Sequence, residues 1–225
     1  MDTAIRKKIE ANFHIIPAET KKAFIFLSEQ SWLGQGGWYL AGGTALALQV
    51  GIRKSVDLDF FTTKPKFSSR SVLNNFLNNN NWQTSIEEDN TIYGELFKAK
   101  ASFIAYPFFV PGLDFFRYGS IKILQPPDIA VMKIIAISQR GRKRDFFDLY
   151  WCAKNIEPPE SLIKKLKIQY PFVAHDYHHI LKSLVYFTDA ESDPEPDIYF
   201  KADWKEVKDY FKKEILNITR KIILE

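Results

Sequence analysis

One stretch constrains the fold more than any other part of this chain. Residues 38–61 read WYLAGGTALALQVGIRKSVDLDFF. The apolar residues 38–41 predict a short buried strand, and Gly42 and Gly43 then allow a tight turn, because glycine readily adopts positive φ. A short helix and a second strand with two aspartates are expected to follow. This order places the turn and the acidic strand in one compact unit.

The second strand carries Asp57 and Asp59 among apolar neighbours. Successive side chains of a strand point to opposite faces, so both aspartates are expected on one face, with Val56, Leu58 and Phe60 facing the core. Two carboxylates about 6 to 7 Å apart repel each other unless a cation lies between them, and such oxygen ligands suit Mg²⁺. The pair therefore predicts a magnesium site.

The glycine turn is the second component of this prediction. Gly42 and Gly43 allow close backbone approach, and a helix that begins just after them points unpaired amide groups at a ligand. Thr44 either caps that helix or donates its hydroxyl to a phosphate oxygen. Alone, each motif is more often an ordinary turn or a solvated strand face. Together they predict a metal–nucleotide site, as nucleotidyl transfer requires.

The same residues resemble a known family. Gly42-Gly43-Thr44 followed by residues 57–60 (DLDF) is similar to the signature of the DNA polymerase β-type nucleotidyltransferase superfamily. Residues 40–61 resemble more closely the AbiEii/AbiGii toxin family of type IV toxin–antitoxin systems, which act in abortive infection. Two later segments, 128–133 (DIAVMK) and 144–149 (RDFFDL), look like downstream motifs of that family.

This resemblance implies an α+β nucleotidyltransferase fold and an enzyme that moves a nucleotide from a nucleoside triphosphate to an acceptor hydroxyl. The implied cofactor is Mg²⁺, the implied acceptor is RNA such as tRNA, and the implied protein partner is a cognate antitoxin. The alternative is a protein of the same fold that binds nucleotide, RNA or a partner without turnover.

The resemblance also assigns roles to residues. Asp57 and Asp59 would hold magnesium, Lys133 would neutralise triphosphate charge, and Asp145 would position Lys133 or the acceptor. The implied nucleotide-binding residues are Gly42, Gly43, Thr44 and Lys133. Further candidates within the matching motifs are Ser55, Asp128, Arg144 and Asp148.

Lys133 lies in residues 129–137 (IAVMKIIAI), a predicted helix that is apolar almost all round. A buried ammonium group is costly unless it meets an anion. Its side chain either extends to the surface or faces the active cleft and pairs with a triphosphate or a carboxylate. The resemblance favours the second arrangement.

A second acidic pair, Asp145 and Asp148, is spaced three residues apart, so both are expected on one helix face. One of them could instead cap the helix or pair with Arg142 or Arg144. The basic residues 140–144 are expected to form a loop that either steers RNA or triphosphate or is simply solvated.

One position departs from the superfamily pattern. Many members place a third metal-binding carboxylate on a later strand, where this chain has Ser102. Either this acid is absent or Asp145 supplies it. The departure weakens the case for a two-metal mechanism.

Composition sets broader limits. The 225 residues suffice for one large domain or two small ones, and we expect a nucleotidyltransferase core over 1–125 and a helical part over 126–225 packed on it. The single cysteine, Cys152, excludes an intrachain disulfide framework. Residues 1–10 do not read as a signal peptide and no stretch predicts a membrane span, so a cytoplasmic protein is expected.

Four segments outside the motifs carry further expectations. Residues 17–33 have the apolar spacing of one amphipathic helix. Residues 93–106 and 115–124 are each read as a single strand. The last third is expected to be mostly helical and to end in a long amphipathic helix from about residue 202.

Overall fold

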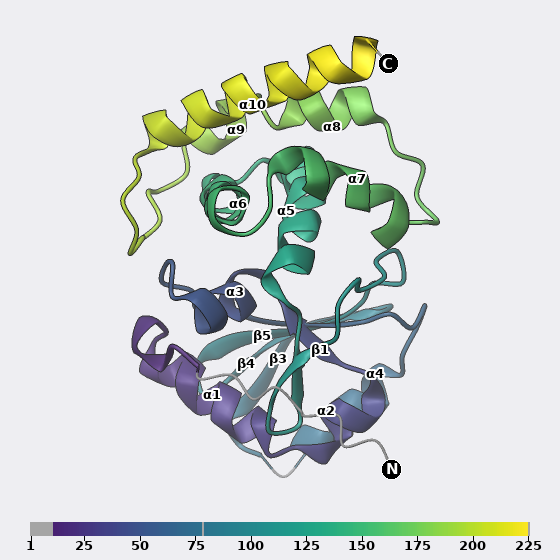
Figure 1. Ribbon diagram of the computed structural model, residues 1–225. Coiled ribbons are helices and arrows are strands. Elements are labelled where there is room, and N and C mark those ends of the chain that lie inside the picture. Colours follow the sequence, from purple (N-terminus) through teal and green to yellow (C-terminus); the bar gives the residue numbers. More distant parts are fainter. Residues whose placement is uncertain (1–10, 78, 225) are drawn as a thin grey trace, which may run out of the picture. The chain divides into compact units, whose positions relative to one another are not determined.

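The structure is a computed structural model that describes residues 11–77 and 79–224. The chain divides into two compact units, the first ending at Gln125 and the second beginning at Pro126 (Figure 1). The prediction about a signal peptide falls on residues 1–10, which lie outside the described residues. No helix in the described part of the chain is long and apolar enough to cross a membrane.

The first unit combines helices with a sheet of seven strands. Its elements are η1 (Phe13–Ile15), α1 (Ala18–Ser28), α2 (Ser31–Gly36), β1 (Tyr39–Ala41), α3 (Gly42–Val50), β2 (Leu58–Thr62), α4 (Ser69–Leu73), η2 (Asn74–Phe76), β3 (Trp82–Glu88), β4 (Thr91–Leu96), β5 (Ala99–Ala105), β6 (Phe116–Tyr118) and β7 (Ile121–Ile123). The strands form one sheet in the order β3-β4-β5-β2-β1-β7-β6. The pairs β1/β7 and β2/β5 are parallel and the others are antiparallel, so the predicted mixed sheet is confirmed.

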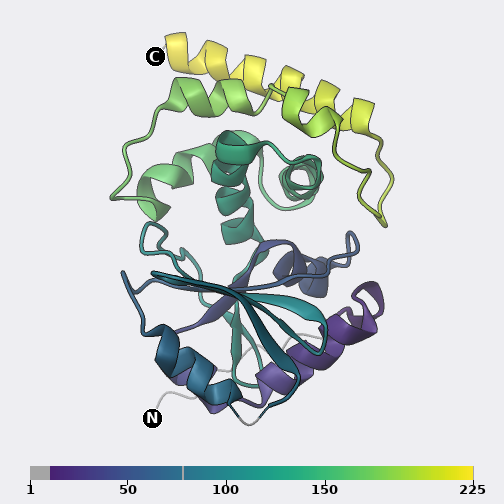
Figure 2. The same cartoon turned by 180° about the vertical axis from the view of Figure 1, so that it is seen from behind.

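One face of this sheet packs against α1, α2 and α4 (Figures 1 and 2). Leu58 and Phe60 of β2 and Phe103 of β5 are almost fully buried there, and the Phe103 ring contacts Trp32 and Phe76. Aromatic packing of this kind stabilises the sheet chiefly by removing apolar surface from water. The opposite face, here called the second face, therefore receives the alternate side chains of each strand.

Burial confirms part of the predicted alternation at the acidic strand. Leu58 and Phe60 are buried, and Asp59 between them lies on the second face. The prediction for Val56 is wrong, since its side chain is 42% exposed. The reason is that β2 begins only at Leu58, so Val56 precedes the strand and does not follow its alternation.

Three predicted elements are each divided in two. The helix expected over residues 17–33 breaks between α1 and α2 at Glu29 and Gln30. The strand expected over 93–106 is β4 and β5, joined by a turn at Phe97 and Lys98, whose φ angles are 53° and 68°. The strand expected over 115–124 is β6 and β7. At Phe97 and Lys98 no glycine or asparagine marked the left-handed turn, so the pattern missed it.

The second unit is helical, as predicted. It contains α5 (Pro126–Arg140), α6 (Lys143–Asn155), α7 (Pro159–Gln169), α8 (Tyr177–Ser183), α9 (Thr188–Glu191) and α10 (Trp204–Leu224). The apolar face of α10 buries Val207, Phe211 and Ile215, and Phe211 contacts Phe146 of α6. The expected basic loop over 140–144 is shorter than predicted, because α5 extends to Arg140 and α6 begins at Lys143.

Candidate active site

The glycine turn forms the start of α3. Gly42 is the first residue of this helix and has a φ of 72°, which favours glycine. The N-cap residue is Ala41, whose own side chain makes no capping bond. A Cβ added to Gly42 would lie 3.3 Å from Oδ2 of Asp59. The turn and the acidic strand are therefore in direct contact, as predicted.

Gly43 makes room for a buried cation that the sequence did not identify. A Cβ added there would lie 2.3 Å from Nη2 of Arg53 and 3.0 Å from Oγ of Ser55. The Arg53 side chain is only 5% exposed, and its Nη1 donates to the carbonyl oxygen of Lys54 over 2.9 Å. A guanidinium group thus lies beside the start of α3, where the helix dipole also favours an anion.

Thr44 has a different environment from the one predicted. It is almost fully buried, and its hydroxyl lies 2.9 Å from Oγ of Ser55 and 2.5 Å from the carbonyl oxygen of Asp57. These contacts connect the first turn of α3 to the segment that enters β2. The hydroxyl of Thr44 therefore serves the local fold, and the backbone of the turn remains the better candidate for contact with a phosphate.

Asp59 accepts a hydrogen bond from a side chain of the neighbouring strand β5. The parallel register of β2 and β5 sets Asp59 directly beside Ser102, and the Ser102 hydroxyl donates to Oδ1 of Asp59 over 2.8 Å. Ser102 is thus at the position where a third carboxylate would face Asp59. Its hydroxyl orients the aspartate and adds no negative charge.

The donor set suits one magnesium ion bound with its substrate. The described residues contain no group of three or more histidine, cysteine, aspartate or glutamate side chains that could hold a metal ion alone. Mg²⁺, however, is commonly bound by one or two carboxylates together with substrate phosphates. Asp59 lies beside Gly42 of the glycine turn and Asp57 is two residues before Asp59 in the chain, so these two aspartates are the candidates for that mode of binding.

The second unit holds Lys133 in a buried charge cluster. Its Nζ atom lies 2.5 Å from Oδ1 of Asp145 and 2.7 Å from Oδ2 of Asp148, and the lysine is 6% exposed. Nη2 of Arg140 lies 3.2 Å from the other carboxylate oxygen of Asp145. Both aspartates belong to one face of α6, as their spacing predicted. Asp148 pairs with Lys133, and Arg142 pairs with Asp193.

This cluster keeps the Asp145 carboxylate ionised. Burial alone would raise the pKa of Asp145, but the charges of Lys133 and Arg140 outweigh burial and hold this pKa below its ordinary value. The two cations balance the charges of Asp145 and Asp148. Both carboxylate oxygens of Asp145 already meet cations, so this residue is poorly suited to replace the missing metal ligand at Ser102.

The remaining predicted residues of the second unit are tied into its fold. Asp128 is buried, and Nε2 of Gln169 donates to it over 2.6 Å. Arg142 pairs with Asp193, and the buried Lys143 pairs with Glu195. Asp193 and Glu195, which precede α10, thus neutralise two cations of the basic segment for which both steering of RNA or triphosphate and simple solvation were considered. Arg144 is exposed at the start of α6.

The structure groups the predicted residues within each unit. In the first unit it brings together Gly42, Gly43, Thr44, Ser55, Asp57 and Asp59, and adds Arg53 and Ser102. In the second it brings together Lys133, Asp145 and Asp148, and adds Arg140. Arg53 was missed because only its burial against Gly43, a tertiary contact, distinguishes it from any loop arginine.

Comparisons with known proteins show the family of this chain. A family model described as "Nucleotidyl transferase AbiEii toxin, Type IV TA system" matches residues 33–93 and 79–217. An uncharacterized protein of Aquifex aeolicus is 36% identical over 186 residues, which cover 79% of this chain and 86% of that protein.

Two solved structures share the fold. MenT4, a nucleotidyltransferase toxin from Mycobacterium tuberculosis, has a TM-score of 0.57 and 15% identity over 90% of this chain and 86% of its own. A candidate nucleotidyltransferase from H. pylori has a TM-score of 0.53 and 19% identity over 93% of this chain and 99% of its own. The matches confirm the predicted family resemblance, the nucleotidyltransferase fold and the enzyme class.

Proposed function

Because the chain belongs to the AbiEii nucleotidyl transferase toxin family of type IV toxin–antitoxin systems, we propose that it moves a nucleotide from a nucleoside triphosphate to a hydroxyl group of RNA. Transfer RNA is the proposed acceptor and Mg²⁺ the proposed cofactor. Family membership also implies nucleotide substrates and an antitoxin as protein partner.

The observation that carries this proposal is the position of Asp59. Its carboxylate lies beside Gly42 of the glycine turn, the first residue of α3, on one side and accepts from the Ser102 hydroxyl on the other. A triphosphate bound at that turn would lie against the backbone amides of α3, with the charge of Arg53 nearby. Its reacting phosphorus would then be next to an oriented carboxylate.

The proposed step joins an acceptor oxygen to the α-phosphorus and breaks the bond between that phosphorus and the bridging oxygen to the β-phosphate. Pyrophosphate leaves, and Asp59 accepts the proton of the acceptor hydroxyl. Asp57 and Asp59 would hold Mg²⁺, which when bound supplies positive charge against the phosphates. The amides of Gly42 and Gly43 donate to phosphate oxygens and keep the triphosphate in place.

We assign Lys133 a role in the same reaction on the strength of the matching motif and its internal geometry. Its ammonium group is buried and is oriented by Asp145 and Asp148. A lysine held in this way has a fixed position from which it would donate to a phosphate oxygen. Asp145 is then a positioning residue, because it acts through Lys133 and not on the substrate.

The experiment incubates the full chain with Mg²⁺, each of the four labelled nucleoside triphosphates, and total tRNA. We expect label in tRNA with the wild type, and a loss of at least 100-fold in Asp59→Asn, in line with removing a key electrostatic group. The matched control is Asp89→Asn, because Asp89 is an exposed aspartate of the same unit in the β3–β4 turn.

The control should label tRNA like the wild type, and circular dichroism should show the same fold for all three proteins. Absence of label from every triphosphate with the wild type would contradict transfer to tRNA. Equal labelling by Asp59→Asn and the wild type would remove Asp59 from the mechanism.

A further inference from the structure

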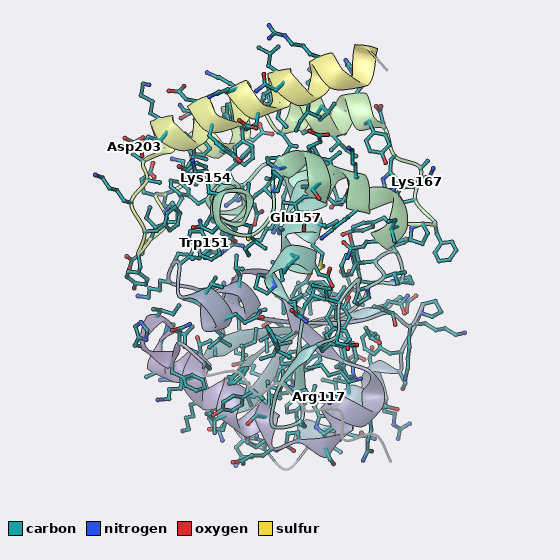
Figure 3. The ribbon with its side chains drawn as sticks, in the orientation of Figure 1. Arg117, Trp151, Lys154, Glu157, Lys167 and Asp203 are labelled. Atoms are coloured by element: carbon teal, nitrogen blue, oxygen red, sulfur yellow. The ribbon has the colours of Figure 1, made fainter. Side chains whose placement is uncertain are left out.

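Two cations face each other across the β6–β7 pair of the first unit. The antiparallel register sets Arg117 opposite Lys122 (Figure 3 labels Arg117). Their neighbours Ile121 and Ile123 are fully buried on the helix-covered face of the sheet. Side chains alternate along a strand, so both Arg117 and Lys122 belong to the second face, which also carries Asp59.

This arrangement is unfavourable without a partner. Like charges directly opposite each other on neighbouring strands destabilise a sheet. Burial and the nearby charge of Arg117 both lower the pKa of Lys122, and its Nζ lies 5.9 Å from the centre of the Phe115 ring. Within residues 11–77 and 79–224, neither cation forms an ion pair with a carboxylate. Half-buried like charges of this kind are what an anion would neutralise.

The pair lies near the candidate active site on the same sheet. Lys122 is beside Tyr39, Tyr39 is beside Phe61, and Asp59 is two residues from Phe61 on the same strand and face. Strand spacing and rise place the Cα atoms of Lys122 and Asp59 about 12 Å apart. A substrate that occupies the Asp59 site and extends across two strands therefore reaches the two cations.

We propose that Arg117 and Lys122 form a phosphate-binding site for the substrate. Arginine provides a planar pair of donors and lysine a compact charge, which together suit the oxygens of one phosphate group. The phosphate comes either from the RNA backbone or from the triphosphate, and the experiment below separates these sources. The site's role in transfer rests on the proposed function, but its binding of phosphate does not.

The experiment measures binding without turnover. The variants Arg117→Gln and Lys122→Gln are compared with Arg70→Gln, because Arg70 is an exposed arginine of α4 in the same unit. The probes are labelled total tRNA and inorganic triphosphate, each titrated over a range of salt concentrations. Thermal unfolding is recorded for every protein.

We expect each site variant to bind tRNA, triphosphate or both about 5- to 10-fold more weakly at low salt, as for a lost phosphate contact. If tRNA is the affected probe, the slope of the logarithm of its binding constant against the logarithm of salt concentration should become less steep. The change should be about one unit for each cation removed, because each cation contacts about one phosphate. Weaker binding of tRNA alone identifies a backbone phosphate, and weaker binding of triphosphate alone identifies the nucleotide. The unfolding temperature should stay equal or rise, because one of two repelling charges is gone.

Two results would overturn the site. In the first, both variants bind both probes like the wild type. In the second, Arg70→Gln weakens binding as much, which indicates general charge attraction. The outcomes for the two proposals are distinguishable: a wild type that binds through this pair but labels no RNA contradicts transfer alone. A wild type that labels RNA with both variants binding normally contradicts this site alone.

Discussion

Replacing Lys133 with methionine tests the buried charge cluster of the second unit. Methionine keeps most of the apolar stem but removes the ammonium group that lies between Asp145 and Asp148. The intact cluster balances two cations, Lys133 and Arg140, against two carboxylates. The variant therefore removes the cation that two buried carboxylates share.

The expected loss is large. Removing one partner of a buried ion pair costs about 3 to 5 kcal/mol, since the remaining charge stays out of water. With a urea dependence of about 2 kcal/mol per molar, a loss of about 4 kcal/mol lowers the unfolding midpoint by about 2 M. A suitable control is Lys164→Met, because Lys164 is exposed on α7 and pairs with Glu160. That change should alter the free energy of unfolding by less than about 1 kcal/mol.

The loss of unfolding free energy in Lys133→Met should also depend on pH. Whether it grows or shrinks with pH follows from the ionisation of the buried carboxylates. In the wild type the pKa of Asp145 is held low, so its stabilisation is present above about pH 4 and is lost as pH falls below that value. In the variant Asp145 loses the charge of Lys133, so its pKa rises and it becomes neutral at a higher pH than in the wild type. The difference between the two proteins is therefore largest at pH 7 and shrinks toward pH 4.

Urea unfolding followed by circular dichroism at pH 7 and pH 4.5 measures both quantities. The double variant Lys133→Met/Asp148→Asn removes one charge of each sign and should recover part of the lost stability. A loss below 1 kcal/mol for Lys133→Met, or an equal loss at both pH values, would refute this account of the cluster.

Three shorter predictions concern the first unit and Cys152. Ser102→Ala removes the donor to Asp59, so we expect about 10-fold slower labelling of tRNA with little change in unfolding temperature. Thr44→Val removes a buried hydroxyl that contacts Asp57, so unfolding free energy should fall by about 1 to 3 kcal/mol, while Thr44→Ser stays close to wild type. Burial raises the pKa of Cys152 above its ordinary range, so a thiol reagent should label it only in denaturant, as absorbance would show.

The sequence predicted those parts of the fold whose signals are local. The glycine turn, the acidic strand and the helical second unit follow from short patterns of residue types, and all three are present. Strand boundaries were predicted less well. The turn at Phe97 and Lys98 has two non-glycine residues with positive φ, and its cause is the pairing of β4 with β5.

The candidate site shows the same division. Asp59 and Lys133 could be chosen from the sequence, because a strand period and an apolar helix made them conspicuous. Their partners could not be assigned in the same way. Ser102 lies beside Asp59 because of the register between β2 and β5. Arg53 lies beside Gly43 because its side chain is buried against α3.

The sequence by itself thus determined the family, the glycine turn and the residue types available for catalysis, because each depends on neighbours within a few positions of the chain. Only the tertiary structure decided which charges meet. It buried the Thr44 hydroxyl, paired Asp148 with Lys133, and set Arg117 opposite Lys122. Hydrogen bonds and ion pairs depend on distances between segments far apart in the chain, and those distances exist only after the strands and helices have packed.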